Sequence, residues 1–355
     1  MREAMKNKTT VSGVSKPAPS KSQGPMTIEM VAKEAGVSPS TVSRILNGTA
    51  VVSEAKKKAV EDAVAKLGFV PNPMARGLAG GRTFSVGVVT QTMDSPFYGP
   101  ALRGIEDALD PAGYSPLFVS GHWQAQTEAR CIDILLSRRV DGIIVLTGRL
   151  TDAALKAYSK KVPMVVTGRT LKAPDLFSLN FDNLEGGRMA TWHLIEQGHR
   201  KIAFISGDPQ HPDAIQRLSG YKLALAQAGI AFKSELVVQG EYNEDSGLQA
   251  VQRLLHAKQQ FTAIFAANDQ MAVGAAHGLL RHGLRVPDDV SLVGFDDLST
   301  SLYAFPPLTT VHQPAYELGQ LAAQAMLKLL VGVKPQIQVP VPRLITRDSC
   351  RRLKV

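Results

Sequence analysis

The sequence feature that most constrains this chain is the stretch from Thr27 to Asn47, TIEMVAKEAGVSPSTVSRILN. Apolar residues recur at helical spacing on both sides of Gly36, so each half can bury one face as a short helix. Thr27 suits the N-cap of the first helix, and Ser38 followed by Pro39 suits the start of the second. The stretch therefore predicts two helices joined by a tight turn at Gly36.

A third helix is predicted after Ser53, over EAKKKAVEDAVAKLGF. Its apolar residues also stand at core spacing, so three helices can bury one small core together. The second helix leaves small polar side chains and Arg44 on its outer face, as in helices that read DNA. A helical hairpin with an ordinary solvated face is the alternative interpretation of this pattern.

The first two helices resemble the headpiece of the lactose repressor family of bacterial transcription regulators, whose signature is close to T-I-x-D-V-A-x-x-A-G-V-S-x-x-T-V-S-R-x-L-N. Met30 departs from it, because the family usually has Asp there, which would complete a capping box with Thr27. The resemblance implies a DNA-binding headpiece over residues 27–70. Its second helix would enter the major groove, with Pro39, Ser40 and Arg44 at base edges and Thr41 and Ser43 on phosphates.

Residues 71–83, PNPMARGLAGGRT, resemble the hinge of the same family. In that family the hinge folds into a helix in the minor groove, with Leu78 here at the position of the wedge residue and Arg76 near phosphates. Three glycines make a plain linker the alternative. The residues expected to contact DNA are Thr27, Ser38, Pro39, Ser40, Thr41, Ser43, Arg44, Asn47, Asn72, Arg76 and Leu78.

The charge distribution agrees with this expectation. Residues 1–83 hold 13 Lys and Arg against 6 Asp and Glu, whereas residues 84–355 hold 27 against 25. A basic excess on the N-terminal piece that carries the helix pair suits phosphate contact through counterion release, although solubility alone is another explanation. Part of the excess lies in residues 1–26, a Ser-, Pro- and Lys-rich tail that we expect to be disordered.

Several other protein classes are disfavoured. No apolar run reaches membrane-spanning length, and residues 1–26 lack the apolar segment of a signal peptide, so we expect a cytoplasmic protein without membrane contact. Cys131, Cys350 and the eight histidines form no recognisable metal or redox motif, so no metal or cofactor is expected. No GxGxxG after a strand, GxxxxGK[ST] or GxSxG occurs, so we expect neither catalytic residues nor an enzyme.

From Phe84 onward, short apolar runs alternate with amphipathic helices, which predicts an α/β fold with doubly wound parallel sheets. The pattern restarts near Lys201, so two lobes with a cleft between them are expected. This part resembles the periplasmic sugar-binding-protein fold that the same family uses as its sensor. The resemblance implies an effector-binding and dimerisation core over 84–345. Its N-lobe would span about 84–181 and 313–343, and its C-lobe about 182–312 and 344–355. The predicted strands are 84–90, 115–120, 142–147, 162–168, 201–207, 236–241, 262–269 and 290–297.

In such sheets the ligand lies beyond the carboxyl ends of the strands. Arg217 and Asp296 take the places of the family's effector-binding Arg and acid, and Gln313 ends the last crossing strand. Of the adjacent Asn268 and Asp269, one can cap a helix, which leaves the other for ligand. The residues expected to contact the effector are Asp94, Phe97, Tyr98, Arg169, His211, Asp213, Arg217, Tyr242, Asn268, Asp296 and Gln313. Lid packing of the aromatic pair and a surface salt bridge of Arg217 are the structural alternatives.

Together these features predict a transcription regulator, expected to be a repressor, that binds double-stranded operator DNA. The effector is expected to be a sugar or sugar acid that binds the cleft and changes DNA affinity. No heptads follow the core before Val355, so a homodimer is expected rather than a coiled-coil tetramer. A constitutive dimeric regulator and a nucleoside- or purine-responsive member of the family are the alternatives.

Overall fold

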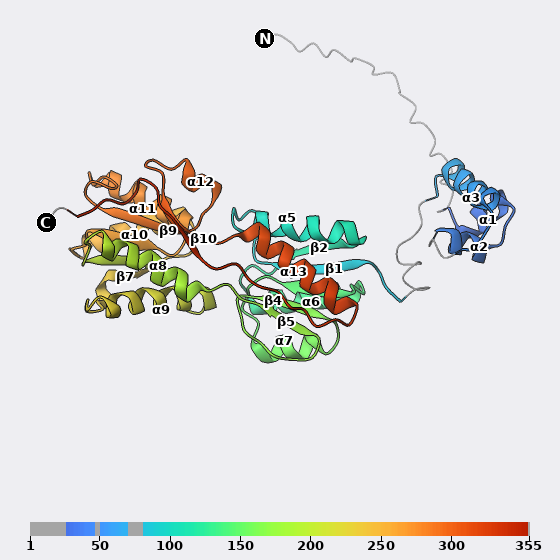
Figure 1. The fold of residues 1–355 in the computed structure, drawn as a ribbon, viewed down its shortest axis with the longest axis horizontal. Coiled ribbons are helices and arrows are strands. Elements are labelled where there is room, and N and C mark those ends of the chain that lie inside the picture. Colours follow the sequence, from blue (N-terminus) through green and yellow to red (C-terminus); the bar gives the residue numbers. More distant parts are fainter. Residues whose placement is uncertain (1–25, 47–49, 70–80, 354–355) are drawn as a thin grey trace, which may run out of the picture. The chain divides into compact units, whose positions relative to one another are not determined.

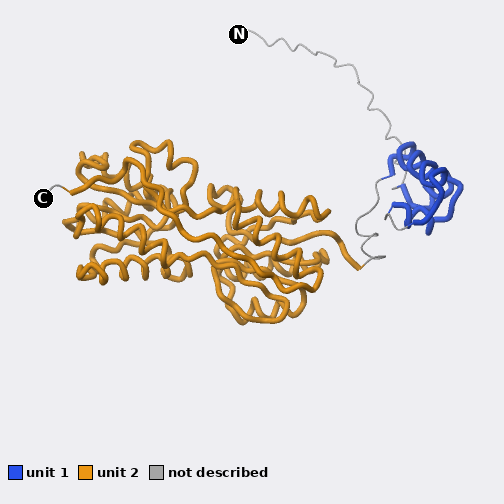
Figure 2. Tube along the Cα trace, in the orientation of Figure 1, with its two compact units in different colours: residues 1–80 blue, residues 81–355 orange. Residues whose placement is uncertain are grey.

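The computed structural model of the protein describes residues 26–46, 50–69 and 81–353. It contains two units, residues 1–80 and residues 81–355, shown in different colours in Figure 2. Residues 1–25 of the predicted tail and residues 71–80 of the predicted hinge lie outside the described ranges.

The first unit contains the three predicted helices. They are α1 (Ile28–Ala35), α2 (Pro39–Leu46) and α3 (Glu54–Leu67). All three helices contribute to one small apolar core, made by Val31, Ala32, Val42, Val60 and Ala63. Helical spacing of the apolar residues therefore predicted the core of this unit correctly.

The turn between α1 and α2 forms as its residues require. Gly36 adopts a left-handed conformation with φ of 66°, and the Val37 N–H donates to the Ala32 carbonyl at 3.0 Å. The Ser38 hydroxyl accepts a hydrogen bond from the Thr41 N–H at 3.2 Å and so caps α2. The expectation for Thr27 needs correction, because it stands at the N-cap position of α1 but its side chain makes no capping bond.

The first sheet of the second unit is parallel, with the strand order β2-β1-β3-β4-β5. Its strands are β1 (Ser85–Thr90), β2 (Ser115–Ser120), β3 (Gly142–Val145), β4 (Met164–Thr167) and β5 (Leu176–Leu179). Apolar side chains on one face pack against α5 and α13, and those on the other face pack against α6 and α7. These helices are α5 (Tyr98–Leu109), α6 (Ala125–Ser137), α7 (Asp152–Ser159) and α13 (Ala315–Leu330), with a 3-10 turn η1 (Asp110–Ala112) after α5.

The second sheet has the order β11-β10-β9-β8-β6-β7. Its strands are β6 (Ile202–Ser206), β7 (Val237–Gln239), β8 (Ala263–Ala266), β9 (Ser291–Asp296), β10 (Thr309–His312) and β11 (Arg343–Ile345). The accompanying elements are α8 (Asn183–Glu196), α9 (Pro212–Gln227), α10 (Glu244–His256), α11 (Asp269–Arg281), α12 (Ser299–Leu302) and η2 (Ser234–Leu236). One strand departs from the predicted parallel arrangement, because β11 pairs with β10 antiparallel.

The two sheets form separate lobes, as the restart of the pattern near Lys201 predicted (Figure 1). The chain passes between the lobes after β5, after β10 and before β11, and α13 packs against α5 of the first lobe. Below, the N-lobe is the lobe built on the first sheet together with α13, and the C-lobe is the lobe built on the second sheet. No helix within the described ranges is long and apolar enough to cross a membrane.

Candidate functional site

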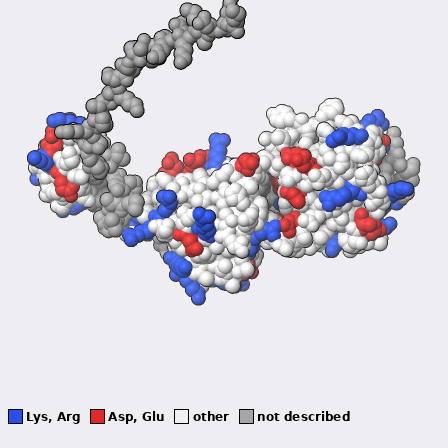
Figure 3. All heavy atoms as spheres, turned by 180° about the vertical axis from the view of Figure 1, so that it is seen from behind, with Lys and Arg blue, Asp and Glu red and all other residues white. Residues whose placement is uncertain are grey.

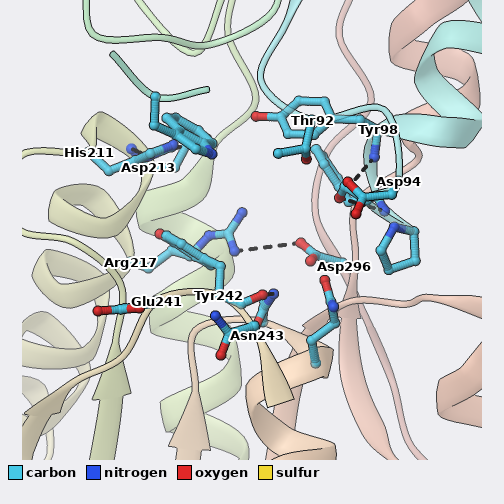
Figure 4. A pocket seen from close by; sticks show the side chains of 16 residues that line it. Thr92, Asp94, Tyr98, His211, Asp213, Arg217, Glu241, Tyr242, Asn243 and Asp296 are labelled. Atoms are coloured by element: carbon cyan, nitrogen blue, oxygen red, sulfur yellow. Dashed lines mark hydrogen bonds and ion pairs between the residues drawn. The ribbon is translucent and has the colours of Figure 1, made fainter. Parts of the chain in front are cut away.

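A cavity of about 400 Å³ lies where the carboxyl ends of strands from both lobes meet (Figure 4). Its wall comes from the segments that follow β1 and β2 in the N-lobe and β6, β7, β8 and β9 in the C-lobe. This is the position at which parallel α/β sheets bind ligands, because strand ends and helix N-termini converge there. The predicted effector residues that line it are Asp94, Phe97, Tyr98, His211, Asp213, Arg217, Tyr242, Asn268 and Asp296.

Arg217 and Asp296 form the charged centre of the cavity. Their side chains point toward each other in Figure 4, with Arg217 Nη1 3.5 Å from Asp296 Oδ1. The two residues are 4% and 6% exposed, so their charges lie away from bulk water. The guanidinium also stacks 3.6 Å from the centre of the Phe295 ring. A buried, oriented pair of this kind presents both donors and acceptors to a polyhydroxylated ligand.

Three N–H groups of the Arg217 guanidinium donate hydrogen bonds to other residues of the protein. Its Nε donates to Asn183 Oδ1 at 2.9 Å, its Nη2 to Gln313 Oε1 at 2.8 Å, and its Nη1 to the Ala267 carbonyl. Gln313 therefore holds Arg217, and it also lines a smaller adjoining pocket that shares Phe97, Tyr98 and Asp213 with the cavity, so its contact with the effector stays a prediction. The surface salt bridge considered for Arg217 is wrong, because the residue is buried.

Aromatic rings from both lobes form one continuous surface along the cavity. We call Phe97, Tyr98, Trp123, His211 and Tyr242 the aromatic wall. Successive ring centres along this wall lie 5.4, 6.3, 4.5 and 5.5 Å apart. Trp123 belongs to the N-lobe and His211 to the C-lobe, so the wall crosses between the lobes. Such a surface suits the apolar face of a sugar ring or a planar base.

Burial changes the protonation behaviour of the wall and the charged centre. It raises the pKa of Asp296 well above its usual range, and the Arg217 guanidinium offsets only part of this rise. Burial lowers the pKa of His211, which favours the neutral imidazole. His211 Nδ1 accepts from the Asp213 N–H at 3.3 Å, which leaves its proton on Nε2.

Tyr242 carries a buried polar group that lies close to Gly207. Its hydroxyl is buried and has no hydrogen-bond partner among the described residues, and burial raises its pKa. Unsatisfied buried hydroxyls are costly, so a ligand that hydrogen-bonds there would recover this cost. The backbone at Tyr242 has φ of 60°, a conformation that is uncommon outside glycine.

Two expectations about neighbouring positions need correction. Arg169 does not line the cavity, because its guanidinium donates to the carbonyls of Gly148 and Leu150 in the N-lobe. Asp269 is not free for ligand either. It is fully buried and accepts hydrogen bonds from the Leu298 N–H and from two hydroxyls, whereas its neighbour Asn268 both caps α11 and lines the cavity.

Sequence reasoning missed several lining residues. They are Thr92, Ser95, Pro96, Trp123, Glu241, Asn243 and Gln270. Trp123 follows β2 directly, so the rule that examines residues after each strand could have found it. Asn243 and Gln270 lie at helix starts, where polar residues are also expected for capping, so the sequence holds no separate signal for them.

The outer face of α2 carries the other candidate site. Ser38, Pro39, Ser40 and Arg44 are exposed, and Thr41 and Ser43 are half-buried. Ser38 Oγ lies 2.9 Å from Ser40 Oγ and 2.8 Å from Thr41 Oγ1, so these hydroxyls form one cluster at the start of the helix. Thr27 is exposed before α1, and the predicted DNA contacts Asn47, Asn72, Arg76 and Leu78 lie outside the described residues.

On the face of the second unit drawn in Figure 3, acidic and basic residues are interspersed over both lobes. This distribution agrees with the near balance of charge over residues 84–355. In the described part of the chain, no cluster of His, Cys, Asp and Glu has an arrangement that could hold a metal ion.

Comparisons with known proteins place these features in one family. Residues 27–72 match the bacterial regulatory proteins of the lacI family, and residues 191–350 match the periplasmic binding protein-like domain. The chain is 36% identical over 307 residues to catabolite control protein A of Priestia megaterium, covering 86% of this chain and 92% of that protein. The chain belongs to the LacI family. The resemblance noted in the sequence and the predicted α/β fold are thus confirmed.

Other relatives extend over nearly the whole chain. The HTH-type transcriptional repressor PurR of Proteus mirabilis (strain HI4320) is 36% identical over 329 residues, covering 91% of this chain and 96% of that protein. The lac repressor dimer bound to operator and the anti-inducer ONPF has a TM-score of 0.84 at 31% identity, covering 92% of this chain and 99% of that one. The CelR–cellobiose complex has a TM-score of 0.69 at 36% identity, covering 91% and 99%. This LacI-family chain is therefore a DNA-binding transcriptional regulator.

Proposed function

We propose that this LacI-family regulator represses transcription by binding operator DNA through its headpiece, and that a sugar bound in the interlobe cavity changes its operator affinity. The observation that carries the proposal is the cavity itself, where Arg217, Asp296 and the aromatic wall converge from two lobes of a chain that also carries a helix-turn-helix. Buried charged donors and acceptors beside stacking rings are the usual means of binding sugars.

In the proposed mode of DNA binding, the headpiece and the hinge contact different parts of the operator. Residues 27–70 form the headpiece, with Pro39, Ser40 and Arg44 directed at base edges. Residues 71–83 form the hinge that reaches the minor groove. The lac repressor structure named above contains operator DNA, which supports this assignment by similarity. The proposed role includes no catalytic step and places the protein in the cytoplasm, where bacterial DNA lies.

The proposed regulator acts as a homodimer. A group of large apolar side chains is exposed on α11, at the end of α12 and in the following loop, with Leu280 67%, Tyr303 83% and Phe305 100% exposed. Exposed apolar groups of this size typically mark contacts between subunits. Paired headpieces would then read two half-sites of a near-palindromic operator. Sedimentation of the full-length protein checks this assignment, with a monomer at all concentrations as the contrary result.

The Asp296→Asn variant separates sensing from DNA binding. The substitution keeps the side-chain volume but removes the charge that faces Arg217, so effector binding should weaken by about tenfold or more. Operator binding without effector should stay as in the wild-type protein, because Asp296 lies in the core and not in the headpiece. Titration of labelled operator with each protein, with and without the sugar, measures both quantities.

The wild-type sugar response must first be found with a panel of sugars and, for the alternative effector class, purines and nucleosides. If purines but no sugars change operator binding, the effector would be a purine base stacked on the aromatic wall and not a sugar. An unchanged sugar response in Asp296→Asn would remove this carboxylate from the binding site, and loss of operator binding by the variant would assign it a structural role.

A further inference from the structure

We propose that the cavity selects uncharged sugars and rejects their acidic and phosphorylated counterparts. The proposal rests on the proposed sugar-sensing function and narrows the sequence-based expectation of a sugar or sugar acid. It follows from the balance of charged side chains around the cavity, because a ligand that loses water must find partners of suitable charge in the wall.

Carboxylates outnumber cations around this cavity. Among the described residues that line it, Asp94, Asp213, Glu241 and Asp296 are acidic, whereas the guanidinium of Arg217 is the one Lys or Arg group. His211 contributes no compensating charge near neutral pH, because burial lowers its pKa. Burial also raises the pKa of Asp296, which favours its neutral form, so the excess of carboxylates rests on Asp94, Asp213 and Glu241. An anionic ligand would therefore face three other carboxylates and one guanidinium.

Arg217 does not offset this excess for a ligand. Its charge faces Asp296 at 3.5 Å, and three of its five N–H donors are used by Asn183, Gln313 and the Ala267 carbonyl. A phosphate or carboxylate would have to displace these partners to obtain a bidentate contact, and would leave them unsatisfied in a buried place. A hydroxyl can instead donate to Asp296 and accept from Arg217 without breaking the pair.

The other carboxylates face the cavity from both lobes. Asp94 lies between β1 and α5 in the N-lobe, and Glu241 lies between β7 and α10 in the C-lobe. Neither carboxylate has a hydrogen-bond or ion-pair partner in the part of the chain that the structure describes. Asp213, 9% exposed, accepts from Asn183 Nδ2 at 3.1 Å and keeps further acceptor capacity. These groups can accept hydrogen bonds from hydroxyls and repel anions.

The aromatic wall favours the same class of ligand. Its rings supply an apolar surface for the C–H face of a pyranose, while the carboxylates can accept hydrogen bonds from its hydroxyl groups. Each part of the cavity thus matches an uncharged, polyhydroxylated ring. The N-termini of α9, α10 and α11 do reach the cavity, but no second Lys or Arg among its described lining residues stands beside Arg217 to form the paired cations that phosphate sites typically use.

Calorimetry with the full-length protein tests the proposal on matched pairs of ligands. The probes are glucose, galactose and cellobiose, each beside its uronic or aldonic acid and its sugar phosphate. Every sugar that binds should bind at least about tenfold more tightly than its acidic partners at low ionic strength. Added salt should reduce this ratio, because screening weakens the repulsion.

The double variant Asp94→Asn/Glu241→Gln should reduce the same ratio by about threefold or more, because it removes two negative charges from exposed positions without touching the Arg217 pair. The matched control is Glu106→Gln/Glu235→Gln, which makes an equal charge change at exposed residues of α5 and η2 that do not line the cavity. The control should keep the wild-type ratio.

Two results overturn the proposal in distinguishable ways. An acid or phosphate that binds wild-type protein as tightly as its neutral partner contradicts the charge argument and leaves sugar sensing intact. If the protein binds neither the sugars nor their acidic or phosphorylated partners, the result contradicts sugar sensing itself. The proposed charge selection, which rests on sugar sensing, is then also wrong.

Discussion

Asp269 illustrates how a single residue can be misassigned from sequence and still matter to the molecule. Its carboxylate is fully buried and accepts from the Leu298 N–H at 2.8 Å and from the hydroxyls of Ser301 and Thr310, each at 2.6 Å. These hydrogen bonds connect α11, which carries Asp269, with α12 and β10. Burial nevertheless raises the pKa of Asp269 to about 6 despite the hydrogen bonds.

This raised pKa predicts how stability depends on pH. The folded state holds the proton of Asp269 more tightly than the unfolded chain, whose pKa is about 3.9. The contribution of Asp269 is therefore fully present below about pH 4 and is lost as pH rises through about 6. In urea unfolding, the free energy of wild-type protein minus that of Asp269→Asn should fall over this window, by at most about 1.4 kcal/mol per pH unit. A difference that stays constant between pH 4 and pH 6 would contradict this assignment.

Residues at strand ends were predictable because the topology of parallel sheets brings them together, and Asp296 at the end of β9 belongs to this group. Arg217, within α9, was predicted from the family resemblance. The sequence could not predict which of Asn268 and Asp269 faces the ligand, since either side chain can cap a helix. Arg169 does follow a strand, as predicted, but its long side chain turns away from the cavity and donates to carbonyls of the N-lobe. Side-chain direction of this kind depends on packing that one sequence does not reveal.

At the level of elements, the helix pair α8 and α9 sets the position of Arg217. The two helices approach so closely that a Cβ on Gly187 would lie 2.4 Å from the Arg217 carbonyl oxygen, and one on Gly220 would lie 2.1 Å from the Leu184 carbonyl oxygen. These backbone carbonyl groups cannot move away from an added Cβ as the end of a flexible side chain can. Glycine at these positions therefore permits the packing that places Arg217 in the cavity.

Gly187→Ala should consequently displace α9. We expect a loss of about 1–3 kcal/mol in the free energy of unfolding from overpacking, together with weaker sugar binding because Arg217 moves with its helix. Gly99→Ala in α5 is the matched control, since a Cβ there meets nothing within 4 Å and should leave stability unchanged or slightly higher. Unfolding and sugar titrations of both variants measure these effects. If Gly187→Ala and Gly99→Ala have the same free energy of unfolding and the same sugar affinity, close packing at Gly187 does not position Arg217.

Most strands were predicted because strands buried on both faces appear as continuous apolar runs. β11 was not, since its three residues are not buried on both faces and form no continuous apolar run, and its antiparallel pairing leaves no mark on the sequence. In the headpiece, helical spacing and Gly36 were sufficient to place α1 and α2. The side-chain cap expected from Thr27 does not form, and the Thr27 side chain instead hydrogen-bonds the side chain of Glu29.

At the scale of the whole second unit, the lobes are joined across the cleft by side chains as well as by the connecting chain. Arg149 of the N-lobe forms an ion pair with Asp208 of the C-lobe and donates to Gln210 Oε1 at 2.7 Å. The loop that presents Arg149 is fixed, because the buried Glu128 carboxylate accepts from the N–H groups of Arg149 and Leu150 at 2.8–2.9 Å. This ion pair therefore stabilises the arrangement in which the lobes are in contact.

Asp208→Asn should favour separation of the lobes and so lower the affinity for a sugar that contacts both. The pair is about one-third exposed and screened by solvent, so the expected loss is modest, about two- to fivefold. Small-angle scattering of the unliganded protein should show a larger radius of gyration, and calorimetry the weaker binding. Arg188→Gln is the control, because its partner Glu185 lies on the same helix. Unchanged scattering and affinity in Asp208→Asn would contradict the role of this pair.

The central claim is that one molecule couples a DNA-reading headpiece to a sugar-binding core. Its most direct test is the fluorescence anisotropy of promoter fragments from beside its own gene, titrated with full-length protein with and without a sugar that binds the core. We predict specific binding that weakens steadily with added salt, and a change of about 5- to 150-fold in Kd when the sugar is present. No preference over random DNA at low ionic strength, or a Kd that a bound sugar leaves unchanged, would contradict the claim.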